Sequence, residues 1–267
     1  HQEDTSICLF NVIKSGRGTS RETLDELIVQ KNDFQNDLLN KTASIAQAKN
    51  VAIYTKHKIA PNVETGIFNE LKSPNPIQLV LFGWPSTDTK IKVPHNIIKE
   101  VLLLAHKNVA VLRDHGLNGL KNILVPIGNG PNARLALKLA SDLAFQQDVH
   151  ITAIRVLPEQ SGKEVEEDER TQMEEIAEDE IGCIPPYLQI KTILSDDVLN
   201  GIVEETEKNL YDLMIIGASE EVYSPAYIFG KLNDDLIEEV ACSILVVRKH
   251  QPQSALWFRQ QIKQIEE

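Results

Sequence analysis

A repeat limits what this chain can fold into more strongly than any other feature of its sequence. Three segments of the first half recur in the second half, and the two members of each pair lie 134 or 135 positions apart. The pairs are Val63–Ile67 with Val198–Ile202, Leu79–Gly83 with Leu213–Gly217, and Val109–His115 with Ile244–His250. Because nearly one offset relates all three pairs, we predict an internal duplication, in which two copies of one fold follow each other along the chain.

Residues 122–144 indicate which fold is repeated. The apolar run Ile123–Ile127 ends at the turn Gly128-Asn129-Gly130-Pro131, and leucines then recur at helical spacing at positions 135, 139 and 143. A continuously apolar strand is typical of a parallel sheet covered by helices on both faces, and a proline suits the first turn of a helix. Strands and helices alternate along the chain, so we predict an α/β fold with a doubly wound, mostly parallel sheet in each copy.

The first copy lacks a counterpart of this opening strand–helix unit. Its first strand, residues 7–13, aligns with residues 151–157, which form the second strand of the second copy. We therefore expect the sequence to be a fragment of a longer chain. We predict a first domain at residues 1–119, incomplete at its N-terminus, a second domain at residues 120–251 and a C-terminal tail at residues 252–267. Apolar residues at helical spacing in the tail predict that it docks on its own domain or on a neighbour.

Charge and composition argue against several classes of function. Acidic side chains number 39 and basic ones 27, which gives a formal net charge of −12. This charge repels nucleic acid and anionic lipid, so neither is expected to be the main partner. No apolar run reaches the roughly 20 residues that a helix needs to cross a bilayer. The cysteines, Cys8, Cys183 and Cys242, lie far apart, and we expect them to be small core residues in a reducing compartment.

No familiar arrangement of catalytic or metal-binding residues occurs in the sequence. It holds no Gly-x-Ser-x-Gly, His-Glu-x-x-His, Walker-type or Cys-x2-Cys motif. Of the histidines, His57, His106 and His250 each adjoin a lysine, which suits an exposed surface better than a set of metal ligands. We predict a protein without catalytic residues, bound metal or cofactor.

Three segments resemble the universal stress protein family. They are Ile123–Pro126, Leu213–Gly217 and Val240–Arg248, the last of which is similar to the final strand of that family. The resemblance covers the second copy in full and the first copy more weakly. It implies two universal stress protein-like domains, each a five-stranded, mostly parallel sheet flanked by helices, with the opening strand–helix unit absent from the first.

Nucleotide binding is one function that this resemblance implies. ATP-binding members carry the motif Gly-x2-Gly-x9-Gly-(Ser or Thr), and here Gly217 and Gly230 fill its first and third glycine positions. Glu220 replaces the second glycine and Lys231 the hydroxyl residue, so a carboxylate stands where a phosphate would approach. In a sensor of ATP or AMP, Lys231 would meet a phosphate. The pocket would be lined by Gly128, Gly130, Asn132, Gly217 and Gly230.

A narrower resemblance points to a membrane transporter. Gly128–Ala136 resembles the Gly-Gly-Gly-Pro-x-Ala-Arg turn, and Leu81–Pro85 the Leu-Gly-Trp turn, of tandem stress-protein modules at the C-terminus of prokaryotic transporters. Such transporters include amino-acid permeases and cation-chloride cotransporters of the amino acid, polyamine and organocation superfamily. The resemblance implies a non-catalytic regulatory and dimerisation domain on the cytoplasmic side of the cell membrane, whose partner is the transmembrane part of the same chain. The remaining interpretation is a free-standing stress protein, which requires a gene that encodes little more than this chain.

The last strand of a copy is the surface through which we expect a homodimer to form. The two candidates are Ile244–Val247 and Val109–Leu112, because the last strand lies at a sheet edge and open edges pair with other strands. The alternative is that these two strands pair with each other inside one chain.

Overall fold

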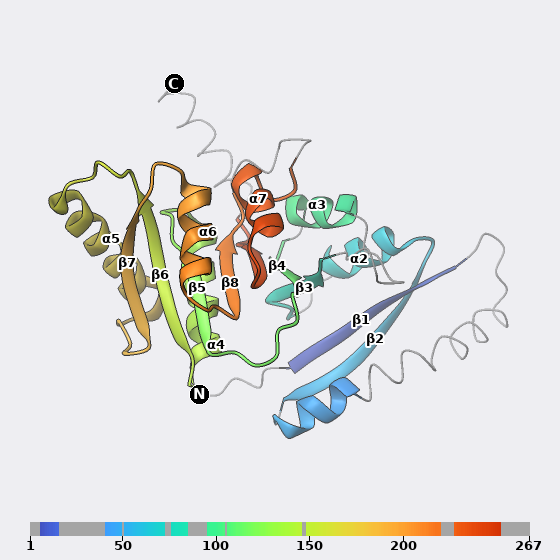
Figure 1. Cartoon of the computed structure of the whole chain (residues 1–267). Coiled ribbons are helices and arrows are strands. Elements are labelled where there is room, and N and C mark those ends of the chain that lie inside the picture. Colours follow the sequence, from blue (N-terminus) through green and yellow to red (C-terminus); the bar gives the residue numbers. More distant parts are fainter. Residues whose placement is uncertain are drawn as a thin grey trace. The chain divides into compact units, whose positions relative to one another are not determined.

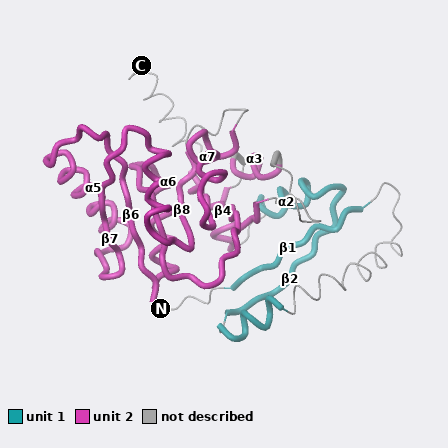
Figure 2. The backbone as a smooth tube through the Cα atoms, viewed as in Figure 1, with its two compact units in different colours: residues 1–75 teal, residues 76–267 magenta. Residues whose placement is uncertain are grey.

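A computed structural model describes residues 6–15, 41–49, 51–72, 76–84, 95–104, 106–145, 148–219 and 227–251. The chain divides into two compact units, residues 1–75 and residues 76–267 (Figure 2). This division falls inside the predicted first domain, residues 1–119, so the compact units do not coincide with the two copies of the repeat. The predicted tail, residues 252–267, lies outside the described residues.

The first unit contains two parallel strands and the helix that follows them: β1 (Ser6–Lys14), β2 (Ala52–Ala60) and α2 (Val63–Lys72). Asn62 begins the helix, because its Oδ1 accepts a hydrogen bond from the backbone N of Thr65 at 2.7 Å. Gly66 lets α2 approach β1 closely, since a Cβ at this position would lie 2.5 Å from Val12 Cγ1. A glycine in the first turns of α2 is therefore part of the packing.

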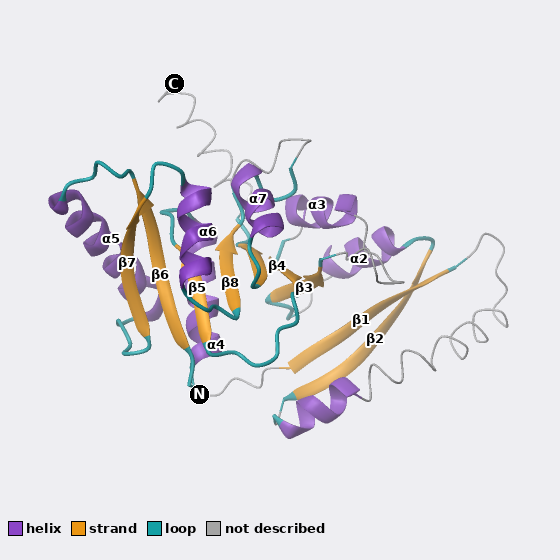
Figure 3. Cartoon of the chain, viewed as in Figure 1, coloured by secondary structure: helices purple, strands orange, loops and turns teal. Residues whose placement is uncertain are grey.

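The second unit is a seven-stranded sheet with helices on both faces (Figure 1, Figure 3). Its strands are β3 (Leu79–Gly83), β4 (Asn108–Arg113), β5 (Asn122–Pro126), β6 (His150–Leu157), β7 (Leu188–Leu194), β8 (Leu213–Gly217) and β9 (Ser243–Arg248). Its helices are α3 (His95–Leu104), α4 (Pro131–Ala144), α5 (Lys163–Ile181), α6 (Val198–Lys208) and α7 (Lys231–Glu239). The strand order is β3-β4-β9-β8-β5-β6-β7, and every neighbouring pair is parallel except β4 with β9. The predicted α/β fold with a mostly parallel sheet is confirmed.

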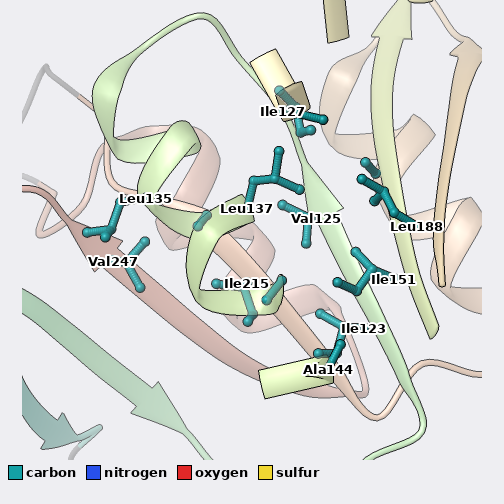
Figure 4. Packing of buried hydrophobic residues seen from close by; sticks show 14 of the residues in the cluster. Ile123, Val125, Ile127, Leu135, Leu137, Ala144, Ile151, Leu188, Ile215 and Val247 are labelled. Atoms are coloured by element: carbon teal, nitrogen blue, oxygen red, sulfur yellow. The ribbon is translucent and has the colours of Figure 1, made fainter. Parts of the chain in front are cut away.

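The core of the second unit lies between α4 and the centre of the sheet (Figure 4). Val125 of β5, Leu137 of α4 and Ile215 of β8 are each fully buried there. The helix buries a face of leucine and alanine, as its sequence predicts. Leu143 is the exception, because it is 37% exposed and lies outside the expected apolar stripe.

The last strands of the two copies pair with each other. β4 and β9 run antiparallel, and their register places Val111 opposite Val246. The two valines are equivalent residues of the two copies, since they lie 135 positions apart in the sequence. A local two-fold axis between β4 and β9 therefore relates the strand pair β3-β4 to the strand pair β8-β9. Of the two interpretations of these strands, the structure shows the pairing inside one chain. Both edges of β4 and both edges of β9 are therefore occupied.

The strand registers of the two copies agree elsewhere as well. Ile7 pairs with Ile53 in the first copy, and the equivalent residues Ile151 and Leu188 pair in the second. In the second copy β5 lies at the centre, paired with β6 on one side and β8 on the other. The described part of the first copy has no strand in this central position, so β1 and β2 form a sheet of their own while β3 and β4 join the larger one. The boundary between the two compact units, at residue 75, falls between the strands of these two sheets.

The cysteines only partly follow their prediction. All three are free; Cys8 and Cys242 are partly buried, but Cys183 is exposed. Cys183 follows Gly182, whose left-handed backbone, with φ of 85°, ends α5. The expectation of a core position is therefore wrong for Cys183. In the part of the chain that the structure describes, no helix has the length and apolar character needed to cross a membrane.

Candidate nucleotide site at the carboxyl ends of β5 and β8

The five predicted pocket residues gather near the carboxyl ends of β5 and β8. After β5 the chain moves to β6 and β7 on one side of the sheet and later returns to β8 on the other side. In open α/β sheets, ligands bind at such a reversal of strand order, outside the carboxyl ends of the strands. Gly128, Gly130 and Asn132 follow β5, Gly217 ends β8, and Gly230 precedes α7. The predicted pocket residues therefore lie at the end of the sheet where open α/β folds bind ligands, and their role in binding stays a prediction.

Asn132 is the most constrained of these residues. Its side chain is 5% exposed, and its Nδ2 donates to the carbonyl of Ala218 at 2.7 Å. Its Oδ1 accepts from the backbone N of Lys249 at 2.9 Å. One amide therefore ties the first turn of α4 to the residues just beyond β8 and β9. Both ends of the side chain are engaged in holding the fold, which leaves little hydrogen-bonding capacity for a ligand.

Gly217 is needed for close packing of strand against helix. A Cβ at Gly217 would lie 2.5 Å from the backbone N of Ala133 and 2.5 Å from the carbonyl carbon of Asn132. Real side chains do not approach a backbone so closely. The first glycine of the predicted phosphate motif is thus explained by packing of β8 against α4, whether or not a nucleotide binds.

Gly230 belongs to a turn that is stabilised from within the chain. Its φ of +102° favours glycine, and it begins α7 without a capping side chain. Asp234 accepts hydrogen bonds from the backbone N of Ile228 at 2.7 Å and of Phe229 at 3.0 Å. Asn233 Nδ2 donates to the carbonyl of Gly217 at 2.9 Å, which links this turn to the end of β8.

Lys231, the residue expected to meet a phosphate, already has an anionic partner. Its Nζ donates to Asp235 Oδ2 at 2.7 Å, one turn further along α7, and this contact raises the pKa of Lys231. The lysine side chain is 69% exposed, so the pair is a surface interaction of small energy. Glu220, which replaces the second glycine of the motif, lies outside the described residues.

The turn between β5 and α4 is held by Arg155, a residue that the sequence prediction missed. Arg155 Nε donates to the carbonyl of Ile127 at 3.2 Å, and its Nη2 donates to Asn129 Oδ1 at 2.8 Å. The guanidinium also forms an ion pair with Glu169 of α5. A single arginine near the end of a mostly apolar strand was the signal that could have identified it. Gly128 is exposed beside this contact, with open space where a Cβ would be.

A second polar cluster recurs in both copies of the repeat. In the second copy, Glu205 Oε1 accepts from Lys191 Nζ at 2.7 Å, from Tyr211 Oη at 2.7 Å and from Asn209 Nδ2 at 3.1 Å. Burial, together with the hydrogen bond to the Glu205 carboxylate, raises the pKa of Tyr211 to about 12. A carboxylate with three donors is satisfied, so the cluster has the character of a structural ion pair.

The equivalent carboxylate of the first copy is Glu70. It meets Lys56 Nζ at 2.7 Å and Lys58 Nζ at 3.6 Å. The hydrogen bond from Lys56 is the main cause that lowers the pKa of Glu70. Among the described residues, no group of three or more histidine, cysteine, aspartate or glutamate side chains could hold a metal ion.

Comparison with known proteins identifies the class of fold. The sequence model of the universal stress protein family matches residues 119–248, which lie in the second copy. No curated protein matches the chain.

Two solved structures are similar over most of the chain. A universal stress protein from Archaeoglobus fulgidus DSM 4304 matches with 15% identity and a TM-score of 0.59, over 90% of this chain and 87% of that chain. The cytoplasmic domain of a prokaryotic cation chloride cotransporter matches with 15% identity and a TM-score of 0.58, over 95% of this chain and 99% of that chain. At these identities the similarity shows the fold.

Proposed function

We propose that this chain is a non-catalytic, cytosolic regulatory and dimerisation domain of a prokaryotic secondary membrane transporter, of the cation-chloride cotransporter or amino-acid permease type. One observation carries the proposal. The fold likeness to the cytoplasmic domain of the cotransporter extends over 95% of this chain and 99% of that domain. It therefore extends over both copies of the repeat, and it covers slightly more of the two chains than the likeness to the universal stress protein does, at 90% and 87%.

The contacts at the candidate nucleotide site support a structural role for its residues. Asn132 and Gly217 are explained by the packing of α4 against β8, and Lys231 is paired with Asp235. A domain that regulates through its own conformation needs such packing and needs no bound nucleotide. The antiparallel pairing of β4 with β9 joins strands of the two copies into one sheet, which gives a mechanical connection between them.

We still propose a homodimer, but it does not form through the last strand of either copy. Because β4 and β9 occupy each other's edges, the last strands have no free edge with which to pair across two chains. Dimerisation would therefore use another surface of the domain. Sedimentation equilibrium over a wide concentration range tests it: a dimer is expected, and a monomer at every concentration would remove dimerisation from the function.

The location of the protein in the cell tests the transporter proposal directly. An antiserum raised against this chain is used on fractionated cells of the source organism. We expect a band in the membrane fraction at a mass well above the 29.9 kDa of this chain. A band near 29.9 kDa in the soluble fraction would identify a free-standing protein and contradict the proposal. Solute flux by the transporter with and without this domain, at matched protein amounts, then measures regulation.

A nucleotide sensor is the second candidate, and one observation favours it. The predicted pocket residues do gather at the reversal of strand order, where ligands bind in related sheets. Equilibrium dialysis with ATP and with AMP separates the two functions. Binding that is weakened by Lys231→Ala would favour the sensor, whereas no binding at millimolar ligand would exclude it.

A further inference from the structure

The turn at residues 227–230, which precedes α7, is held by side chains of the first copy. The ring of Trp84, just after β3, lies tilted against the ring of Phe229, and the two ring centroids are 5.7 Å apart. Lys99 of α3 donates a hydrogen bond through its Nζ to the carbonyl of Tyr227 at 2.9 Å. Phe229 is fully buried. The first copy thus contacts a turn that belongs to the candidate nucleotide site of the second copy.

The second copy holds the same turn with hydrogen bonds of its own. The backbone N of Ser219, just after β8, donates to the carbonyl of Phe229 at 2.8 Å. Asp234 of α7 accepts from the backbone N of Ile228 at 2.7 Å and of Phe229 at 3.0 Å. The turn therefore has partners in both copies. A short segment that is held by a few such contacts can open locally while the sheet stays folded.

Trp84 is an addition to a backbone that the two copies share. The second copy has Ala218 at the equivalent position of the repeat. The backbone N of Trp84 donates to the carbonyl of Leu112 at 2.7 Å, and the backbone N of Ala218 donates to the carbonyl of Val247 at 2.8 Å. Leu112 and Val247 are themselves equivalent residues, 135 positions apart. Because the backbones agree and the side chains differ, the indole ring is what allows the first copy to contact the turn.

Lys99 is a second difference between the copies. The equivalent residue of α7 is Asp234, 135 positions later. Lys99 donates to a carbonyl of the other copy, whereas Asp234 accepts from amides of its own turn. An ionised carboxylate has no proton to donate to a carbonyl, so Asp234 cannot make the reciprocal contact. The first copy therefore holds the second through two side chains that the repeat does not supply in return.

We propose that the turn at residues 227–230 is a conformational switch of the second copy, and that the first copy sets how often it opens through Trp84 and Lys99. The two contacts stabilise the closed turn at the carboxyl end of β8. Their loss releases the turn while the sheet stays folded. The coupling is reciprocal, because a contact that favours the closed turn equally favours the position of Trp84 that makes it.

This inference deepens the proposed regulatory function, on which it rests for its purpose, since it supplies a connection through which one copy can act on the other. Its test uses the chain of 267 residues by itself. Failure of the test would therefore leave the transporter proposal standing, and a free-standing protein in the soluble fraction would leave the result of the test unchanged.

Hydrogen exchange, followed amide by amide with NMR, tests the proposal. The amides of Ser219, Ile228 and Phe229 report on the turn, because each makes or receives one of its hydrogen bonds. In Trp84→Ala we expect these amides to exchange about tenfold faster than in the parent, because an aromatic contact of the closed state is lost. Lys99→Met should accelerate the same amides to a smaller extent, since it removes one hydrogen bond.

Leu188→Ala separates local opening from a general loss of stability. Leu188 is 7% exposed and lies on β7, at the opposite end of the sheet from β3. This substitution should lower the melting temperature by several degrees and leave exchange in the turn as it is in the parent. Equal acceleration in Leu188→Ala and Trp84→Ala would show that the turn opens only when the whole unit unfolds. Unchanged exchange in Trp84→Ala would show that the indole does not hold the turn, and either result overturns the proposal.

Fluorescence measures the coupling in the reverse direction. The chain has two tryptophans, so Trp257→Phe leaves Trp84 as the sole indole. In that background Asp234→Ala removes the acceptor of two amides of the turn. We expect acrylamide to quench the fluorescence of Trp84 roughly twofold more strongly in this variant, because the turn opens more often. Asp235→Ala is the matched control, since Asp235 pairs with the exposed Lys231 on the same helix. Quenching that is unchanged in Asp234→Ala would contradict the coupling between the copies.

Discussion

Lys191 Nζ donates a hydrogen bond to Glu205 Oε1 at 2.7 Å, and Lys56 makes the same contact with Glu70, also at 2.7 Å, in the first copy. Both carboxylates are 5% exposed. A strand lysine thus reaches a buried helix carboxylate at the same place in both halves of the chain. Because a buried carboxylate is strongly unfavourable without partners, the pairing is a constraint on each copy of the fold.

Removing the cation of this pair should destabilise the second copy. Lys191→Met leaves the buried carboxylate of Glu205 with the neutral donors Tyr211 and Asn209 only. We expect a loss of about 2–4 kcal/mol in the free energy of unfolding, measured with urea. The control is Lys208→Met, which breaks a surface pair with Glu204 and should change stability by less than about 0.5 kcal/mol. Equal losses of stability in the two variants would show that the buried ion pair stabilises the fold no more than the surface pair does.

Acid should weaken the first unit through Glu70. Lys56 lowers the pKa of this carboxyl in the folded state, so the folded protein binds a proton less readily than the unfolded chain. The stabilisation is therefore complete above about pH 4.5, the ordinary range of a glutamate, and is lost as pH falls through the lower folded value. An NMR titration of the Glu70 carboxyl measures the folded pKa. Glu70→Gln should remove this part of the acid dependence, and a normal titration of Glu70 would contradict the prediction.

High pH should destabilise the second copy, because Tyr211 then loses its proton. Its pKa is raised to about 12 by burial and by the Glu205 carboxylate, compared with about 10 for an exposed tyrosine. The phenol therefore contributes stability that is complete below about pH 10 and is lost as pH rises through 12. The ultraviolet absorbance of tyrosinate should show a late titration step near pH 12 to which Tyr211 contributes. Tyr211→Phe should reduce the late absorbance change by that of one tyrosine, and an unchanged late step would contradict the prediction.

Strong local signals are the reason that much of the fold could be predicted from sequence. The apolar run before Gly128 and the proline after Gly130 correspond to β5, which ends at Pro126, and to α4, which begins at Pro131. Repeated residues such as Gly66 and Gly201 indicated the duplication, and both pack where a Cβ would crowd a valine, Val12 or Val156. Each of these features can be recognised in one short stretch of sequence or by comparing two such stretches.

The parts that were missed depend on contacts between distant segments. The repeat predicts that the first copy lacks the opening strand–helix unit, but it does not predict that the chain divides into compact units at residue 75. Two roles at the candidate site were also hidden: Asn132 bonds to residues 86 and 117 positions away, and Arg155 to residues of the preceding turn. Gly217 was predicted to line a phosphate site because it matches a sequence motif. In the structure, a glycine is required there because the backbone of α4 lies too close for a side chain.

Gly217 and its repeat equivalent Gly83 allow a final prediction that tests this explanation. In Gly217→Ala the new Cβ would lie 2.5 Å from the backbone of Asn132 and Ala133, so strand and helix must separate. We expect a loss of about 1–3 kcal/mol in the free energy of unfolding without any nucleotide present. Gly83→Ala is the matched control, because nothing lies within 4 Å of the position that a Cβ would take there. Urea unfolding of both variants decides the matter, and a Gly217→Ala variant as stable as the parent would contradict the packing role.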